Sequence, residues 1–144
     1  MDYWKFIQVK KTHSMPHHFE NTMVVQTEHL DDQNHVNNVM YVQFMQDIAM
    51  QHWFSISSPA LNEEIVWVVK RHEIDYHAPA FLNDELLLKT HTGEATAVTW
   101  DRHYEIIRVS DNKRLITAKS CWVMLDKKTG RPRRIDETIK AVFD

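Results

Sequence analysis

The most constraining feature of this sequence is the stretch 36–54, which contains neither glycine nor proline and only one formally charged residue, Asp47. Apolar residues recur through all of its turns, which predicts a helix of about five turns and roughly 28 Å. Its few polar residues fall on a narrow stripe. A helix that is apolar around most of its circumference has to be wrapped by the rest of the chain.

The residues around this stretch predict strands. In the strand expected at 98–109, Trp100, Tyr104 and Ile106 alternate with polar residues. Short links between consecutive strands favour antiparallel pairing. The sequence therefore predicts an α+β fold, in which a curved antiparallel sheet of about five strands wraps one long buried helix, followed by a short C-terminal helix from about Ile135. The expected strands are 22–27, 65–78, 85–94, 98–109 and 115–125.

Length and composition indicate one ordinary globular domain. The chain has 144 residues, of which 43% are hydrophobic and 26% charged, and it contains no repeat or linker-like segment. We expect a single domain over 1–144, with residues 1–21 as an N-terminal extension that includes a possible short strand at 3–9. The net charge of −3 argues against nucleic acid as a partner.

The numbers of cysteines and glycines further limit the cellular compartment and the kinds of binding site that the sequence allows. A single cysteine, Cys121, excludes an intramolecular disulfide, and its place in a strand favours a buried, inert thiol. The sequence shows neither a signal peptide nor a membrane-spanning stretch, so we expect a cytoplasmic protein that does not engage membranes. With only two glycines, the chain lacks the glycine-rich loops that bind phosphates, and no cofactor is expected.

Chemistry is most plausible where an amide- and carboxylate-rich segment, 31–38, enters the long helix. The first turn of a helix presents free N–H groups and the positive end of its dipole, which can stabilise an oxyanion. Asp31 lies close enough to act as a general base or as a nucleophile. Capping is the simpler interpretation of such residues, and we expect Asn34 or Asn37 to cap the helix.

The run Asp31-x-x-x-His35-Val36-Asn37-Asn38-x-x-Tyr41, with Phe44 and Asp47 beyond it, resembles a known family. It is similar to the hotdog-fold acyl-CoA thioesterases of the 4-hydroxybenzoyl-CoA thioesterase-like superfamily, especially the bacterial long-chain acyl-CoA and plant acyl-ACP branches. The resemblance covers about residues 20–140. Two shorter pieces reinforce it, Ile74-x-Tyr76-x-x-Pro79 and Thr129-Gly130-Arg131-Pro132.

The resemblance implies a hydrolase that converts an acyl thioester to a free carboxylic acid and CoA. Asp31 matches the family's catalytic carboxylate, and Asn38 matches the position whose backbone N–H binds the thioester oxygen. His35 and Asn37 fall at polar active-site positions, which implies a catalytic role for His35 and a substrate-binding role for Asn37. Tyr41 would line the acyl pocket and bind substrate as well. Residues Met40, Phe44 and Trp53 are candidates to flank an acyl channel, although residues of these types are more often core.

Three positions depart from the family's pattern. Asn34 stands where most members have glycine, Gln33 where the acyl-ACP branch has asparagine, and Pro79 where that branch has a further glutamate. Asparagine tolerates a left-handed turn, so the first departure is compatible with the same loop. The other two favour a mechanism with a single carboxylate.

Several alternatives remain at this point. An acyl-ACP thioesterase, a hotdog hydratase or dehydratase using Asp31 and His35, and a non-catalytic acyl-CoA-binding protein share the same features.

No metal site is expected, since the histidines lack the spacing of metal ligands. A basic cluster is either a solvated loop or a contact for CoA phosphates or an acidic carrier protein. Exposed sheet edges predict a homodimer or homotetramer. The histidines in question are His13, His17, His18, His29 and His35, and the cluster comprises Lys127, Lys128, Arg131, Arg133 and Arg134.

Overall fold

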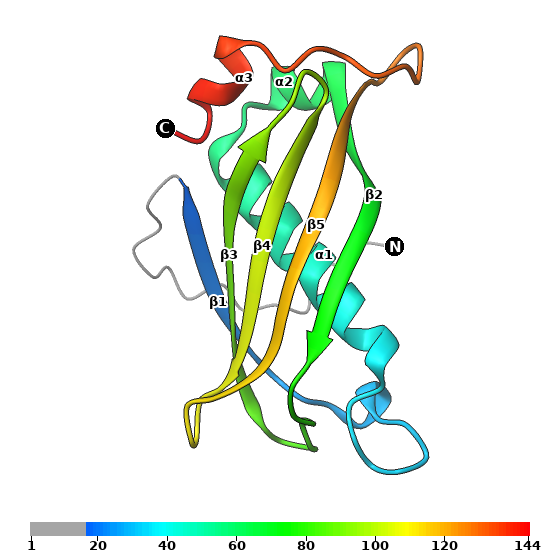
Figure 1. Ribbon diagram of the computed structural model, residues 1–144, viewed down its shortest axis with the longest axis vertical. Coiled ribbons are helices and arrows are strands. Elements are labelled where there is room, and N and C mark those ends of the chain that lie inside the picture. The colour runs from blue at the N-terminus through cyan, green and yellow to red at the C-terminus, as the bar shows by residue number, and fades with distance from the viewer. Residues whose placement is uncertain (1–16) are drawn as a thin grey trace.

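A computed structural model describes residues 17–144, which form one antiparallel sheet and one long helix (Figure 1). The α+β fold expected from the sequence is confirmed. The helix predicted at 36–54 begins and ends two residues later than expected. The elements are β1 (His18–Val24), a short 3-10 turn (Thr27–His29), α1 (Asn38–Ile56), α2 (Pro59–Glu64), β2 (Ile65–Tyr76), β3 (Glu85–Ala95), β4 (Thr99–Arg108), β5 (Lys113–Asp126) and α3 (Glu137–Ala141).

The strand order in the sheet is β1-β3-β4-β5-β2, with every neighbouring pair antiparallel. β3, β4 and β5 pair consecutively, as their short links predicted. β2 does not pair with β3, the next strand in the chain; it pairs with β5, where Tyr76 lies opposite Ile116. The link 77–84 is longer than a tight hairpin and carries the chain from one side of the sheet toward the other, so the expectation of pairing was wrong here.

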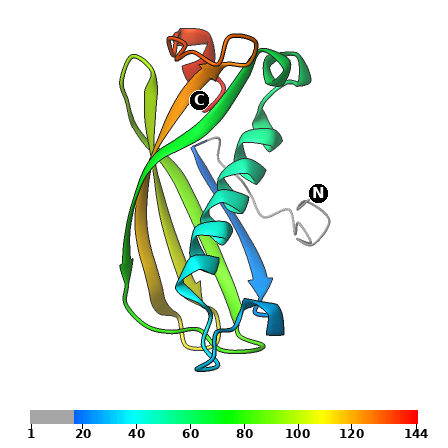
Figure 2. The ribbon, with the colours of Figure 1, turned by 90° about the vertical axis from the view of Figure 1, so that its right-hand side faces the viewer.

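One face of α1 packs on the sheet and supplies most of the core (Figure 2). Met45, Ile48 and Phe44 are almost fully buried, against sheet residues such as Leu86 and Ile116. Each such side chain contributes about 1.5–3 kcal/mol by leaving water. The opposite face of α1 is not wrapped, since Val39 is 72% exposed and Phe54 47%. The sheet of one chain is not wide enough to close around the helix.

Three local expectations need correction. β1 begins at His18, inside the segment expected to be an extension, and its Phe19 belongs to the core. Cys121 is half-buried rather than buried. No element was expected between the long helix and the strand at 65–78, but the chain forms the short helix α2 there. The possible strand at 3–9 lies outside the described residues. Among residues 17–144, no helix is long and apolar enough to cross a bilayer.

Candidate active site

The loop before α1 is a tight turn closed by Asp31. The backbone N–H of Asp31 donates to the carbonyl of His35 at 2.8 Å, and the N–H of Asn34 donates back to the Asp31 carbonyl at 3.1 Å. Asn34 has a φ of 61°, in the left-handed region that glycine and asparagine adopt most readily. The substitution of asparagine for the family's glycine is therefore accommodated in this turn, as expected.

The side chain of Asp31 is oriented by the same turn. Its Oδ1 accepts hydrogen bonds from the backbone N–H groups of Gln33, at 2.9 Å, and His35, at 3.2 Å. Within residues 17–144 its Oδ2 has no hydrogen-bond partner. Two backbone donors therefore hold one oxygen of a half-buried carboxylate and leave the other available for chemistry.

The first turn of α1 offers a free backbone donor beside this carboxylate. Asn37 is the N-cap, since its Oδ1 accepts from the N–H of Val39 at 3.1 Å. The capping prediction is thus confirmed for Asn37. Asn38 is the first residue of the helix, is exposed, and its N–H has no acceptor among the described residues. Such an N–H, at the positive end of the helix dipole, suits an incoming carbonyl oxygen.

The five site residues expected from the sequence line one cavity of about 460 Å³. Residues from the end of β2 complete it: the Tyr76 hydroxyl donates to the Asn38 carbonyl at 3.4 Å, and His77 Nε2 lies 2.8 Å from Thr117 Oγ1. In the sequence Tyr76 stands out only as part of a motif, and no sequence signal predicted a place for His77 in the cavity. The expected residues in this cavity are Asp31, His35, Asn37, Asn38 and Tyr41.

Tyr41 forms the inner wall of the cavity and is 2% exposed. Its hydroxyl accepts a hydrogen bond from the backbone N–H of Ala80 at 3.2 Å, and burial raises the pKa of Tyr41. Beyond it, Phe44 is packed in the main core, whereas Trp53 belongs to a second cluster of buried residues. The expected acyl channel along Met40, Phe44 and Trp53 is therefore not a continuous cavity in this structure.

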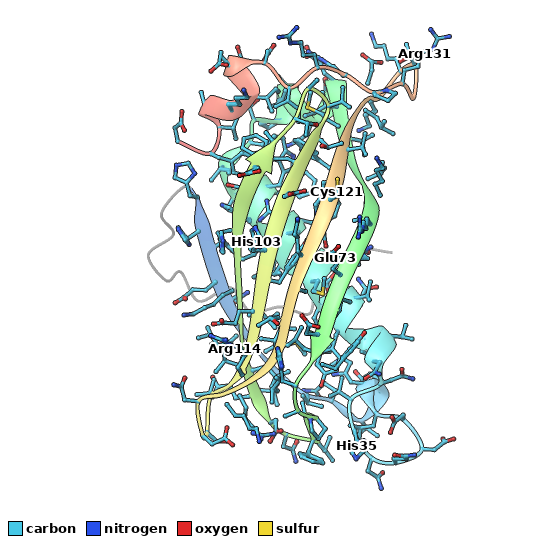
Figure 3. All side chains as sticks on the ribbon, in the orientation of Figure 1. His35, Glu73, His103, Arg114, Cys121 and Arg131 are labelled. Carbon is cyan, nitrogen blue, oxygen red and sulfur yellow. The ribbon has the colours of Figure 1, made fainter. Side chains whose placement is uncertain are left out.

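The other candidate groups lie elsewhere. Arg131, in the basic cluster, is at the opposite end of the long axis from His35 (Figure 3), so the cluster and the cavity of the same chain are far apart. Within the cluster, Arg133 pairs with Glu64 at 3.4 Å. Among residues 17–144, no group of three or more His, Cys, Asp or Glu side chains is arranged to hold a metal ion.

The sequence was also compared with protein families. The model of the acyl-ACP thioesterase N-terminal domain matches residues 16–143. The chain belongs to the acyl-ACP thioesterase family. It is a hotdog-fold thioesterase that acts on acyl thioesters, as the Asp31-to-Tyr41 motif predicted. A comparison with curated protein sequences gave no significant match.

Solved structures share the fold of this thioesterase at low sequence identity. A 1,4-dihydroxy-2-naphthoyl-CoA thioesterase from Synechocystis has a TM-score of 0.75 and 17% identity, over 88% of this chain and 95% of that chain. The probable thioesterase YbaW from Escherichia coli has a TM-score of 0.74 and 22% identity, over 85% and 94%. The 12:0-ACP thioesterase from Umbellularia californica has a TM-score of 0.76 and 15% identity, over 86% of this chain and 48% of that longer chain.

Proposed function

We propose that this thioesterase hydrolyses acyl-CoA esters to a free carboxylic acid and CoA, with Asp31 and Asn38 as its catalytic residues. One observation carries the proposal. A carboxylate oxygen of Asp31 and the backbone N–H of Asn38, neither with a hydrogen-bond partner among residues 17–144, line the same cavity at the start of α1.

In the proposed reaction the thioester carbonyl oxygen accepts a hydrogen bond from the Asn38 N–H. The helix dipole stabilises the negative charge that develops on this oxygen. Asp31 Oδ2 either removes a proton from an attacking water or attacks the carbonyl carbon itself.

In the first route the new C–O bond forms as Asp31 takes the proton, the C–S bond then breaks, and the leaving CoA thiolate takes that proton back from Asp31. In the second route the bond from Oδ2 to the carbonyl carbon forms and the C–S bond breaks, which leaves an anhydride between the acyl group and Asp31. Water then hydrolyses this anhydride, which restores the Asp31 carboxylate and releases the free acid and a proton that the thiolate takes up.

His35 and Asn37 position this pair in the proposal. The backbone N–H of His35 holds Asp31 Oδ1, and the cap formed by Asn37 sets where the helix begins and therefore where the Asn38 N–H points. The imidazole of His35 packs edge-on against Phe81, with 5.6 Å between ring centroids, on the wall of the cavity. Tyr41 closes the inner end, where the acyl group nearest the thioester would lie.

Two thioester carriers are candidates. A Staphylococcus aureus protein of the same fold, at 14% identity and a TM-score of 0.79 over 91% of this chain and 84% of that chain, was solved in complex with CoA. This supports CoA esters as the first substrates to test. The family's acyl-ACP model supports acyl-ACP as the second candidate. The replacement of that branch's glutamate by Pro79 favours the single-carboxylate chemistry proposed here.

The test is thiol release from short, long and aromatic acyl-CoA esters and from matched acyl-ACP substrates. Three proteins are compared: wild type, Asp31→Asn, and Asp32→Asn, a control in which the neighbouring exposed carboxylate changes in the same way. We expect wild type and Asp32→Asn to hydrolyse CoA esters and Asp31→Asn to lose about 10²–10⁴-fold in kcat. Intact hydrolysis by Asp31→Asn would remove Asp31 from the mechanism, and hydrolysis of acyl-ACP alone would replace CoA as the carrier.

A further inference from the structure

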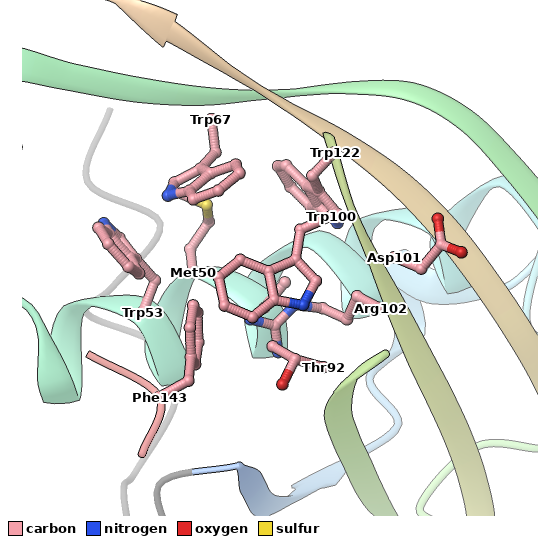
Figure 4. A pocket seen from close by; sticks show the side chains of 10 residues that line it. Met50, Trp53, Trp67, Thr92, Trp100, Asp101, Arg102, Trp122 and Phe143 are labelled. Atoms are coloured by element: carbon pink, nitrogen blue, oxygen red, sulfur yellow. The ribbon is translucent and has the colours of Figure 1, made fainter. Parts of the chain in front are cut away.

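β4 carries two arginines whose side chains are mostly shielded from solvent, and they lie near opposite ends of α1. Arg102 lines a small pocket together with Phe143, near the end of the helix (Figure 4). Arg108 is the last residue of β4 and donates to the carbonyl of Pro79, which lines the cavity of the candidate active site. Of the two, Arg108 is therefore the one that can act on the proposed reaction.

The guanidinium of Arg108 holds the loop 79–84, which we call the wall loop. Its Nη1 donates to the Pro79 carbonyl at 3.0 Å and to Asp84 Oδ2 at 3.3 Å. The same oxygen of Asp84 accepts from the backbone N–H of Phe81 at 2.9 Å, so the beginning, middle and end of the wall loop converge on one cation. The side chains of Arg108 and Asp84 are only 13% and 21% exposed, which shields this ion pair from water better than a surface pair.

The other side of the guanidinium is anchored to the turn between β4 and β5. Nε and Nη2 of Arg108 donate to the two carboxylate oxygens of Asp111, both at 3.1 Å. Such a bidentate pair fixes the plane of the guanidinium as well as its position. Asp111 is itself tied to the start of β5, since its Oδ1 accepts from the N–H of Lys113 at 3.2 Å. The sheet therefore supplies a fixed support from which Arg108 holds the wall loop.

The wall loop is joined to residues 31–37, which we call the Asp31 loop. The carbonyl of Ala80 accepts from the N–H of Val36 at 2.9 Å. Phe81 and His35 form an antiparallel bridge, and their rings pack edge-on. The N–H of His35 then donates to Asp31 Oδ1 at 3.2 Å. An unbroken series of hydrogen bonds and peptide bonds thus runs from Arg108 to the carboxylate of the proposed reaction.

From these contacts we propose that Arg108 is a positioning residue for thioester hydrolysis. It fixes the wall loop against the Asp31 loop and so sets where the Asp31 carboxylate lies relative to the Asn38 N–H. This inference rests on the proposed function, because Arg108 acts only through Asp31. The cavity is lined by residues between 31 and 41 and by 76–79, so Arg108 works from behind its wall.

The kinetic signature of this role follows from how the site is shared. A displacement of about 1 Å at reacting groups can lower a rate by roughly 10²-fold. Substrate binding is distributed over the whole cavity, whereas attack requires Asp31 at one place. Loss of the Arg108 contacts should therefore lower kcat more than it raises KM.

The first experiment measures Tm, kcat and KM for the thioester that wild type hydrolyses fastest. Well below its Tm, Arg108→Gln should lower kcat about tenfold or more and raise KM by less than about threefold. Arg108→Lys keeps the charge and loses the bidentate pair, so its kcat should lie between those of wild type and Arg108→Gln. Arg114→Gln is the matched control: this exposed arginine pairs with Glu105 at 3.0 Å, and its loss should change kcat by less than about twofold.

The second experiment is amide hydrogen exchange of the full chain, which does not depend on activity. In Arg108→Gln the N–H groups of Val36 and His35 should exchange at least about tenfold faster than in wild type. The N–H of Ile48, in the middle of α1, should exchange at an unchanged rate. A general loss of stability would instead raise exchange at all three positions together.

Three results would overturn the proposal: an unchanged kcat in folded Arg108→Gln, an equal loss of kcat in Arg114→Gln, or unchanged exchange at Val36 and His35. If Arg108→Gln does not fold, Asp111→Asn replaces it, since it keeps the arginine and weakens only its anchor. That variant should show the same pattern with a smaller change, and wild-type behaviour would refute the role of Arg108. If wild type hydrolyses no thioester, the proposed function fails, and exchange still shows whether Arg108 holds the Asp31 loop.

Discussion

The hydroxyl of Tyr41 links the first turn of α1 to the loop before β3 through a hydrogen bond with Ala80. The variant Tyr41→Phe tests whether the partner of this hydroxyl is Ala80 or the substrate. Ala80 is fully buried, and its N–H donates to the Tyr41 hydroxyl at 3.2 Å. Phenylalanine keeps the ring and leaves that N–H without an acceptor, which costs about 1–3 kcal/mol. For a chain of this length each kcal/mol lowers Tm by about 2–4 °C, so we expect Tm to fall by roughly 2–12 °C.

Activity should change much less, because the hydroxyl is engaged by Ala80 and is not directed at the substrate. We expect kcat/KM for the best ester to fall by less than about threefold, which is below 1 kcal/mol. Tyr76→Phe is the matched control: its hydroxyl is on an exposed side chain, 3.4 Å from the Asn38 carbonyl, and its loss should change stability by no more than about 0.5 kcal/mol. A Tyr41→Phe variant with unchanged Tm and a tenfold higher KM would refute the reasoning and make Tyr41 a substrate contact.

Three further predictions concern the loop, α1 and the sheet edge. Asp31→Ala removes the acceptor of two backbone N–H groups and should lower the free energy of unfolding in urea by about 1–2 kcal/mol. Asp31→Asn keeps an oxygen at this position and should lower it by less. Equal losses of unfolding free energy in the two variants would contradict the role of Oδ1 in the turn. Burial raises the pKa of Asp47, so the folded state binds its proton more tightly than the unfolded chain and stability falls as pH rises through that pKa. Asp47→Asn should therefore raise the urea midpoint at pH 7, with a gain that shrinks as the pH falls toward 3.8; a gain that is the same at both pH values would show that the charge is not the cause. Val66 and Val68 expose apolar surface on the edge strand β2, so we expect a homodimer or homotetramer by light scattering, and a mass of 17.2 kDa at micromolar concentration would exclude both.

Much of the fold could be predicted because its signals are local. The 36–54 stretch has a helical pattern throughout, and the structure shifts its ends by only two residues. Along β4, the alternation of Tyr104 and Ile106 with polar neighbours matches their burial. Asn34 adopts the left-handed turn that its residue type allows, and Asn37 caps the helix as its position before the apolar run suggests.

The parts that were missed depend on distant residues or on an ambiguous local signal. Nothing within β2 specifies that it pairs with β5 rather than β3, since register and partner are set by the sheet as a whole. Ser58 and Pro59 follow the long helix, where a proline is typical of a helix end. A serine cap followed by proline at the first position is equally typical of a helix start, and α2 begins there. Tyr76 and His77 reach the cavity only because β2 ends beside Asn38.

Arg102 is a core residue whose burial also depends on distant parts of the chain. Its position in β4 belongs to the apolar face, together with Tyr104 and Ile106, where a charged residue is rarely found without a partner. From the sequence no prediction was made for Arg102, and only the tertiary packing shows that this side chain is buried, with its guanidinium carbon 5.8 Å from the centroid of the Phe143 ring. The long helix thus separates two polar features: a carboxylate beside a helix N–H at its start, and near its end a buried arginine that forms no ion pair within residues 17–144. Packed core residues such as Met45 and Ile48 fill the space between these two features.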